Sequence, residues 1–512
     1  MLMRPAFAQW ASLAQQNHAA ASAWLFEVAG TPACDVRALA RREALSDGAG
    51  FSARIGVELD VPGDPDGLIV ATGHQPELYH PGVWIKDFLL QRLADETGST
   101  ALDIVVDTDG FDTVSVSSPC FKPDVARCTQ YLAVGTEDGC FACAPVPPAD
   151  EIERFRIAVD DQLATLRAPA LRRHFADFAA ALEAVRPDVE SLSELLTFAR
   201  RRFEASAGSR YLELPATTMA GSEAFATFVV DMAISAKRFS TEYNRALADY
   251  RVVNKTRSAA QPFPDLASAE GRIELPLWLI SRGHRSTVWV EPFPSGGARL
   301  VSDDETTIAD LPAAPASAVA TLLASGAQLA PKALALTLFV RAFVCDLFIH
   351  GVGGGGYDHV TDGVLRGYYG VEPPAFVVAS MTMYLPLGAH VVTDDEVSAA
   401  LAKLNRLQHN PDAMLSDVEF DSADEEARAM ALAAEKSTLV AAIAEPDANK
   451  KEIGTKIREV NAALSELLEP LKDALSAEME NLQSQRAASE ILTDRTYPFC
   501  FWSAQEVADK AR

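Results

Sequence analysis

The sequence predicts an α/β protein with a parallel-sheet core, helical connecting insertions and a C-terminal antiparallel pair of helices. Apolar runs at 68–71 and 104–106 have the length and branching of buried parallel strands. Each run ends in a cluster of polar residues, and open parallel sheets bind ligands at the carboxyl ends of their strands. From residue 453 onward, apolar residues recur at steps of three or four, which indicates a long amphipathic helix.

The first polar cluster follows the run at 68–71 and precedes a helix that we expect over 84–90. It is a glycine turn with two histidines, a pattern typical of a loop that grips a phosphate or another substrate group beside a helix N-terminus. We therefore take His74 and His80 as catalytic candidates. The substrate-binding candidates of the same turn are Thr72, Gly73 and Gln75. The alternative is that both histidines only hydrogen-bond the turn.

The second polar cluster contains three carboxylates, which we take as further catalytic candidates: Asp107, Asp109 and Asp112. Carboxylates at a strand end can hold a cation, orient an amine or a ribose, or act as a base. Their spacing is not that of a calcium-binding loop. If the two strands are neighbours, this cluster and the histidine turn lie at the same edge of one sheet. The alternative is that the aspartates build turns or cap a helix.

The third cluster is a run of four glycines at 353–356, flanked by polar and aromatic residues. Consecutive glycines let a backbone approach a ligand closely and turn several amides inward, as phosphate-binding loops do. We take Gly353, Gly354, Gly355, Gly356, Tyr357 and Asp358 as substrate- or nucleotide-binding candidates. The run matches neither the Walker spacing nor the dinucleotide fingerprint, and a flexible loop is the alternative. We expect His74, Asp109 and these glycines to converge in one pocket.

In this order, the three clusters resemble those of the cysteine-adding enzymes that complete bacillithiol biosynthesis. In that family a T-G-Q-Q-x-G-L-F-like turn follows the first core strand, and a D-x-D-F-D-E-like cluster follows a later strand. A G-G-P-G-E-like loop then precedes a proline-rich strand. The similar segments here are 72–79, 107–112, 351–357 and 372–378. The resemblance implies a Rossmann-like core related to class I aminoacyl-tRNA synthetases, helical connecting insertions, and a C-terminal coiled coil that pairs subunits.

The sequence departs from the family pattern at His74, where the family has glutamine, and it lacks the acidic residue that follows the family's glycine loop. The expected activity is that of a ligase that joins an amino acid, cysteine in the family, or a similar amine to a small polar acceptor. ATP or ADP is the cofactor considered. Two alternatives stay open: a non-catalytic nucleotide- or metabolite-binding protein whose coiled coil recruits partners, and a nucleotidyl- or glycosyl-transferring enzyme.

Composition narrows the class of protein. A chain of 512 residues with 48% hydrophobic residues can bury large cores. Its net charge of −26 argues against tight nucleic-acid binding. Neither a secretion signal nor a bilayer-spanning stretch is recognised, so we expect no membrane association. Seven cysteines, an odd number, fit a reducing cytoplasm better than a disulfide framework.

Shifts in pattern divide the chain into three parts. Residues 1–148 and 331–392 form the predicted core, and 149–330 form an inserted helical region with a small β unit at 274–301. Residues 393–512 form the predicted C-terminal helical region. There, a helix at 431–443 reverses at 445–449 and pairs with a helix that is kinked at Pro470. We expect these helices to form a homodimer, because a helix of that length exceeds what a core face covers.

Two further groups of residues are candidates for binding. Four cysteines within a short stretch, Cys120, Cys128, Cys140 and Cys143, could supply thiolates to zinc. Their irregular spacing favours the alternative of small buried hydrophobic residues, so zinc is not expected. Asn244 and Arg257 belong to a group of donors and cations at one helix end, where they could hold an anionic group of a substrate.

Overall fold

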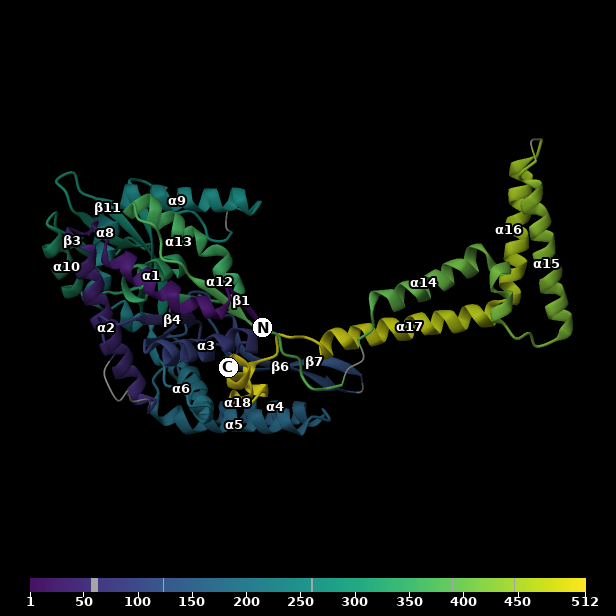
Figure 1. Cartoon of the computed structure of the whole chain (residues 1–512), viewed down its shortest axis with the longest axis horizontal. Helices are drawn as coiled ribbons and strands as arrows, with labels where there is room; N and C mark the ends of the chain where they lie inside the picture. Colours follow the sequence, from purple (N-terminus) through teal and green to yellow (C-terminus); the bar gives the residue numbers. More distant parts are fainter. Residues whose placement is uncertain (57–62, 123, 259–260, 389–390, 446) are drawn as a thin grey trace. The chain divides into compact units, whose positions relative to one another are not determined.

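The computed structural model describes residues 1–56, 63–122, 124–258, 261–388, 391–445 and 447–512 (Figure 1). The chain is a mixed α/β protein that divides into two compact units. The first unit comprises Met1–Cys120, Arg127–Leu385 and Arg495–Arg512. The second comprises Phe121–Ala126 and Pro386–Asp494. Within the described residues, no helix is both long enough and apolar enough to cross a membrane.

The central sheet of the first unit has six strands in the order β1-β16-β15-β4-β5-β8. All neighbouring pairs are parallel except the edge pair of β1 and β16, so the predicted parallel strands at 68–71 and 104–106 are confirmed. The strands are β1 (Leu2–Arg4), β4 (Ile69–His74), β5 (Thr100–Val105), β8 (Leu212–Pro215), β15 (Leu347–His350) and β16 (Val377–Ser380).

Alternate residues of each strand face opposite sides of the sheet, and helices pack on these faces. Ile69 and Ala71 of β4 belong to a large apolar cluster that also contains residues of α2 (Ala33–Arg54) and α8 (Glu223–Ile234). Helix α3 (Pro81–Thr97), which includes the predicted helix at 84–90, packs on β4, β5 and β16. The remaining helices of this unit are α1 (Trp10–Ser22), α4 (Ala149–Ala164), α5 (Pro169–Val185), α6 (Leu192–Glu204), α7 (Ala216–Met219), α9 (Ala236–Val253), α10 (Pro315–Ala324), α11 (Ala333–Phe339), α12 (Val352–Tyr357), α13 (His359–Val364) and α18 (Ala504–Ala511).

A buried carboxylate fixes the start of β15 next to β4. Asp346 accepts hydrogen bonds from the Ile69 amide at 2.8 Å and from two arginines of α2, Arg37 Nη2 at 2.5 Å and Arg41 Nη1 at 3.1 Å. The Asp346 amide in turn donates to the Ile69 carbonyl at 2.7 Å. The register of the two strands, with Ile349 opposite Thr72, follows from this attachment.

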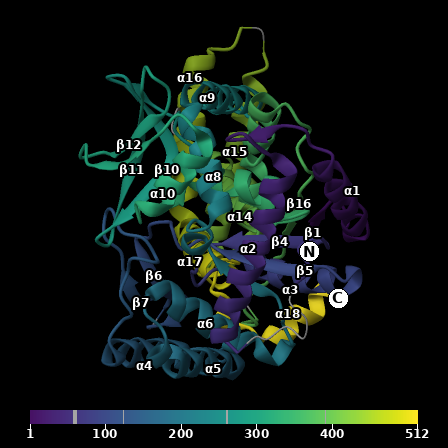
Figure 2. The same ribbon diagram turned by 90° about the vertical axis from the view of Figure 1, so that its left-hand side faces the viewer.

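The small β unit predicted at 274–301 is an antiparallel sheet in the order β13-β12-β11-β10-β14, and β9 pairs with β10. Helices α8 and α10 lie against this sheet (Figure 2). Its strands are β9 (Ser268–Ala269), β10 (Arg272–Ser281), β11 (His284–Pro292), β12 (Ala298–Ser302), β13 (Thr307–Leu311) and β14 (Gln328–Pro331). Two hairpins complete the strands, β2 (Glu27–Val28) with β3 (Thr31–Pro32) and β6 (Thr113–Phe121) with β7 (Val125–Val134).

The second unit consists mainly of helices, which are α14 (Asp394–His409), α15 (Ala423–Ala442), α16 (Lys450–Leu467) and α17 (Glu469–Leu492). The single helix predicted to kink at Pro470 is two helices, because α16 ends at Leu467 and α17 has the proline in its first turn. Apolar residues of the predicted seam, Val460, Leu464 and Leu475, are buried inside this unit. The predicted reversal at 445–449 includes residue 446, which lies outside the described residues.

The two units differ from the three predicted parts of the chain. The inserted region 149–330 belongs to the same compact unit as the core. The C-terminal part does not continue to residue 512, because Arg495–Arg512 return to the first unit and α18 packs on α3. This return is fixed by a hydrogen bond from the Phe499 amide to the Tyr79 carbonyl at 2.7 Å.

We predict that Asp346→Ala lowers the free energy of unfolding by about 3–5 kcal/mol, because it leaves Arg37 and Arg41 buried without their counter-charge. Chemical denaturation of the purified variant measures this loss. The control is Asp150→Ala, which removes an exposed ion pair with Arg154 and is expected to cost no more than about 0.5 kcal/mol. Equal losses in the two variants would contradict the structural role given to Asp346.

Candidate functional site

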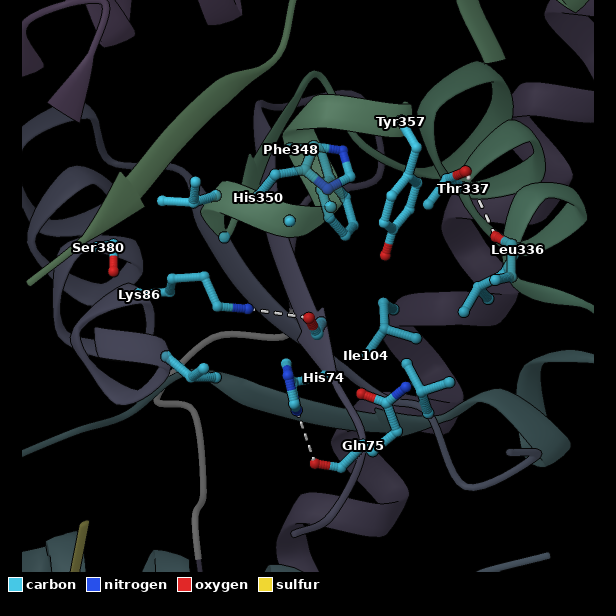
Figure 3. A pocket seen from close by; sticks show the side chains of 18 of the residues that line it. His74, Gln75, Lys86, Ile104, Leu336, Thr337, Phe348, His350, Tyr357 and Ser380 are labelled. Atoms are coloured by element: carbon cyan, nitrogen blue, oxygen red, sulfur yellow. Dashed lines mark hydrogen bonds between the residues drawn. The ribbon is translucent and has the colours of Figure 1, made fainter. Parts of the chain in front are cut away.

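A cavity of about 530 Å³ opens at the carboxyl ends of β4, β5 and β15. The polar side chains of its lining come from segments far apart in the sequence (Figure 3). In Figure 3, His74, Lys86 and Tyr357 lie around a common space. The apolar side chains of the lining include Ile104, Leu336, Val340 and Phe348. The polar lining side chains are His74, Gln75, His80, Lys86, Asp109, Thr337, His350, Tyr357, Ser380 and Arg495.

The predicted convergence of the three clusters is found. His74, Asp109 and the glycines Gly353 and Gly354 all line this cavity. They meet because β15 lies beside β4, and β4 lies beside β5, in one parallel sheet. The carboxyl ends of these three strands therefore share one edge, where such sheets bind ligands.

The histidine turn contributes most of its predicted residues to the cavity. Gly73, His74, Gln75 and His80 line it, and Gln75 Nε2 donates to Asp109 Oδ2 at 2.7 Å. Thr72 is the exception. Its hydroxyl is fully buried, donates to the Ile349 carbonyl at 2.8 Å and thereby ties β4 to β15. Its assignment to substrate binding is corrected to a structural role.

Burial sets the protonation of the histidines in this turn. Burial and the neighbouring Lys86 cation lower the pKa of His74 to about 3. Burial also lowers the pKa of His80, and Arg495 adds to the effect. Both rings are therefore neutral at pH 7.

The aspartate cluster divides into three environments. Asp109 lines the cavity, and burial raises its pKa although the bond from Gln75 opposes this. Asp107 is buried and accepts from the Thr217 amide at 3.0 Å and from its hydroxyl, while burial raises its pKa to about 6. Asp112 is exposed and lies outside the cavity lining. Of these three aspartates, only Asp109 lines the cavity, as predicted for a catalytic residue.

The four clustered cysteines form two separate disulfides, Cys120–Cys128 and Cys140–Cys143. The expectation that the cysteines stay reduced is therefore corrected for these four. Among the described residues, no group of three or more His, Cys, Asp or Glu side chains is arranged to hold a metal ion. The remaining Cys345 and Cys500 are buried, and Cys34 is exposed.

The Cys140–Cys143 turn holds the aspartate turn in place. The Phe141 amide donates to the Asp109 carbonyl at 3.1 Å, and the Ala142 amide donates to the Asp107 carbonyl at 2.9 Å. The buried Phe141 ring also stacks on Phe111, with the ring centroids 4.5 Å apart. The position of Asp109 in the cavity thus depends on a disulfide-closed turn.

The glycine run is a short helix, α12, instead of the predicted loop. Gly353 and Gly354 line the cavity. Gly355 packs against β16, where a Cβ atom would collide with Val378, and Gly356 lies outside the lining. The run therefore does not form a cradle of four inward-facing amides.

The two residues that follow the glycine run have different placements. Tyr357 points its hydroxyl into the cavity (Figure 3). Asp358 is fully buried behind the cavity, where it pairs with Arg341 Nη1 at 2.5 Å and contacts His350 Nε2 at 2.9 Å. Its predicted role in substrate binding is corrected to support of His350.

The two candidates of the inserted region lie away from the cavity. Asn244 exchanges two hydrogen bonds with the backbone of Leu266, at 3.0 Å and 2.8 Å, which fixes the connector after α9. Arg257 is exposed and outside the cavity lining. Neither residue keeps its predicted role in holding a substrate anion.

Five of the ten polar side chains that line the cavity were not among the sequence candidates, and three of these five can carry a charge: Lys86, His350 and Arg495. Lys86 is buried in α3 and donates to Thr72 Oγ1 at 3.1 Å and to the Gly73 carbonyl at 2.9 Å. Burial lowers the pKa of Lys86. In the sequence, Lys86 could have been recognised as a candidate because Lys86 and Asp87 form a charged pair inside an otherwise apolar helix. His350 ends an apolar strand in the same way as His74, whereas nothing in the sequence connects the exposed Arg495 with the cavity.

No protein-family model matches the chain, and no curated protein sequence matches it.

We predict that Cys140→Ser combined with Cys143→Ser loosens the aspartate turn. The amides of Phe141 and Ala142 should exchange with deuterium about tenfold faster than in the wild type, equivalent to about 1.4 kcal/mol of local stability. Hydrogen exchange read by mass spectrometry measures this effect. The matched control is Cys120→Ser with Cys128→Ser, which removes the other disulfide. The same acceleration in the control, or none in the test variant, would refute the prediction.

Proposed function

We propose that the protein is an enzyme of the carbon–nitrogen ligase class that joins an amino acid or a similar amine to a small polar acceptor. The observation that carries this proposal is the combination of opposite charges in one cavity. Asp109 supplies a carboxylate on one side, and Lys86 and Arg495 supply cations elsewhere in the lining. An amino acid carries the complementary charges, an ammonium and a carboxylate.

The cavity residues have distinct roles in this proposal. Asp109, whose Oδ2 is held by Gln75, faces the amine of the substrate. Lys86 and Arg495 bind a carboxylate or phosphate, and the apolar wall accommodates an aliphatic or thiol side chain. The neutral histidines His74 and His80 hydrogen-bond the reacting groups, and a histidine of the lining takes up the proton that is released when the carbon–nitrogen bond forms.

The resemblance to the cysteine-adding enzymes of bacillithiol synthesis supports cysteine as the first amino acid to test. We propose that the sheet is a divergent Rossmann-like core of that type. ATP or ADP is the proposed cofactor; when bound, ATP would supply the phosphoryl group that activates the acid for amide formation. The residues available to its phosphates are Lys86, Arg495 and the backbone of Gly353 and Gly354.

We further propose that the chain forms a homodimer through its C-terminal helices. The residues that support this idea are exposed apolar side chains of α14 and α15: Leu401, Met430 and Val440. We predict a dimer by light scattering at micromolar concentration. The test variant has these three residues replaced by glutamine, and we expect it to be monomeric. A monomeric wild type, or a triple variant that stays fully dimeric, would contradict this interface.

We predict that Asp109→Asn weakens amino-acid binding at least about tenfold, because a charge-assisted hydrogen bond to the ammonium contributes about 1.5–3 kcal/mol. Calorimetric titration with cysteine and other amino acids measures the affinity. Because burial raises the pKa of Asp109, wild-type binding should also weaken as the pH falls and this carboxylate becomes protonated, at a higher pH than for an ordinary aspartate.

The matched control is Asp112→Asn, which removes an exposed carboxylate from the same turn and should change the affinity less than about twofold. Mass spectrometry of the reaction mixture, with ATP present, then tests for an amide product. Equal weakening in both variants would reject Asp109 as the amine-binding group. Binding without any product would favour the non-catalytic alternative.

A further inference from the structure

The three histidines of the cavity differ in which ring nitrogen is occupied and by what, because each ring has a different hydrogen-bond partner. His80 Nδ1 accepts a hydrogen bond from the Gly82 amide at 3.0 Å. In the neutral ring, the proton of His80 is therefore on Nε2. His80 can donate to a ligand from that atom, but it has no free lone pair with which to accept a proton.

His74 has a lone pair in the cavity but a poor environment for a second proton. Its Nδ1 lies 3.2 Å from the Gln75 carbonyl, which can only accept, so the ring proton is on Nδ1 and the lone pair is on Nε2. Lys86 lies close by and its charge opposes protonation of this ring. Among the residues that the structure describes, no carboxylate is hydrogen-bonded to His74 to stabilise an imidazolium.

His350 combines a lone pair with a buried counter-charge. Its Nε2 lies 2.9 Å from Asp358 Oδ2, so Nε2–H donates to the carboxylate and the lone pair is on Nδ1. Asp358 also binds Arg341 Nη1 at 2.5 Å and accepts from the Thr361 hydroxyl at 2.6 Å. Burial alone would raise the pKa of Asp358, but Arg341 and His350 lower it, so the carboxylate stays charged.

The backbone beside His350 leaves room at the reactive nitrogen. A Cβ atom on Gly354 would lie 3.1 Å from His350 Nδ1, closer than ordinary van der Waals contact. Glycine at this position therefore keeps the Nδ1 edge of the ring open. Gly354 and His350 both line the cavity. The need for glycine at position 354 is a reason for the glycine run that does not depend on phosphate binding.

We propose that His350 Nδ1 is the base that takes the proton from the attacking amine, and that Asp358 is its positioning residue. This assignment rests on the proposed ligase function. The amine nitrogen forms the new carbon–nitrogen bond to a carboxylic acid that is activated as a phosphoric anhydride. As that bond forms, the N–H bond breaks, and its proton goes to Nδ1. The phosphate oxygen leaves with the electron pair of the broken carbon–oxygen bond. The imidazolium then returns its proton to solvent or to the departing phosphate.

The proton positions can be measured without any substrate. In protein labelled with ¹⁵N-histidine, the His350 resonances, assigned by their loss in His350→Gln, should show a protonated Nε2 and an unprotonated Nδ1 at pH 7. Asp358→Asn should shift the ring toward the other tautomer, because the carboxylate no longer fixes Nε2–H. Asp358→Glu keeps the charge and should retain the wild-type tautomer if the chain folds. A protonated Nδ1 in the wild type would overturn the assignment.

Turnover separates the base from a merely structural histidine. His350→Gln should lower the rate of amide formation at least about 100-fold while amino-acid affinity changes less than about threefold. His359→Gln is the matched control, because His359 is an exposed histidine beyond the same glycine run and should leave both quantities unchanged. Product formation by His350→Gln at more than about a third of the wild-type rate would overturn the assignment.

The pH profile gives an independent readout of Asp358. The Asp358 charge raises the pKa of His350 against the effect of burial. Its removal in Asp358→Asn should move the acid limb of the kcat/KM profile to lower pH, and an unmoved limb would count against the dyad. A wild-type chain that binds amino acids but forms no product contradicts the proposed function itself. A wild-type chain whose turnover survives in His350→Gln contradicts only the role of His350.

Discussion

The site depends on the parallel pairing of β15 with β4. This pairing places His350 beside the histidine turn, although most of the chain lies between them in sequence. Asp346 holds the pairing from the amino ends of the strands, through the Ile69 amide and the two arginines of α2. An ion pair buried at this depth is costly to assemble and costly to break. It specifies one register for β15 and so determines which side chains meet at the opposite edge.

A second buried network positions the helix that carries Lys86. Arg200 of α6 pairs with Asp87 at 2.9 Å, next to Lys86 on α3, and with Glu213 of β8 at 2.7 Å. The Arg200 guanidinium therefore connects α3 to β8, which is the neighbour of β5 in the sheet. The charges of the cavity are thus supported by buried partners behind it, which limits their freedom to reorient before a ligand binds. Preorganised charges of this kind can stabilise a charged intermediate at little reorganisation cost.

The sequence was sufficient for the strands and for the shared edge, because apolar runs that end in polar clusters are a local pattern. The sequence was insufficient to predict the features that depend on tertiary contacts. Glycine disfavours helices, yet 353–356 are helical, and the close packing of Gly355 on Val378 leaves no room for a side chain at position 355. Asp109 and Asp112 belong to the same polar cluster in the sequence, and only the fold of the turn places Asp109 in the cavity lining and leaves Asp112 exposed outside it. The two disulfides join cysteines close together in sequence, but spacing alone does not distinguish a disulfide from two free thiols. The return of Arg495 to the first unit is a long-range outcome that no local pattern reports.

We propose that one cavity at the carboxyl ends of β4, β5 and β15 binds the substrate. The most direct test is a crystal structure of the protein soaked with cysteine at a concentration that saturates binding in solution. We expect electron density inside the cavity, with the amine at Asp109 and the carboxylate at Lys86 or Arg495. Density only at another surface, or an empty cavity at saturation, would contradict it.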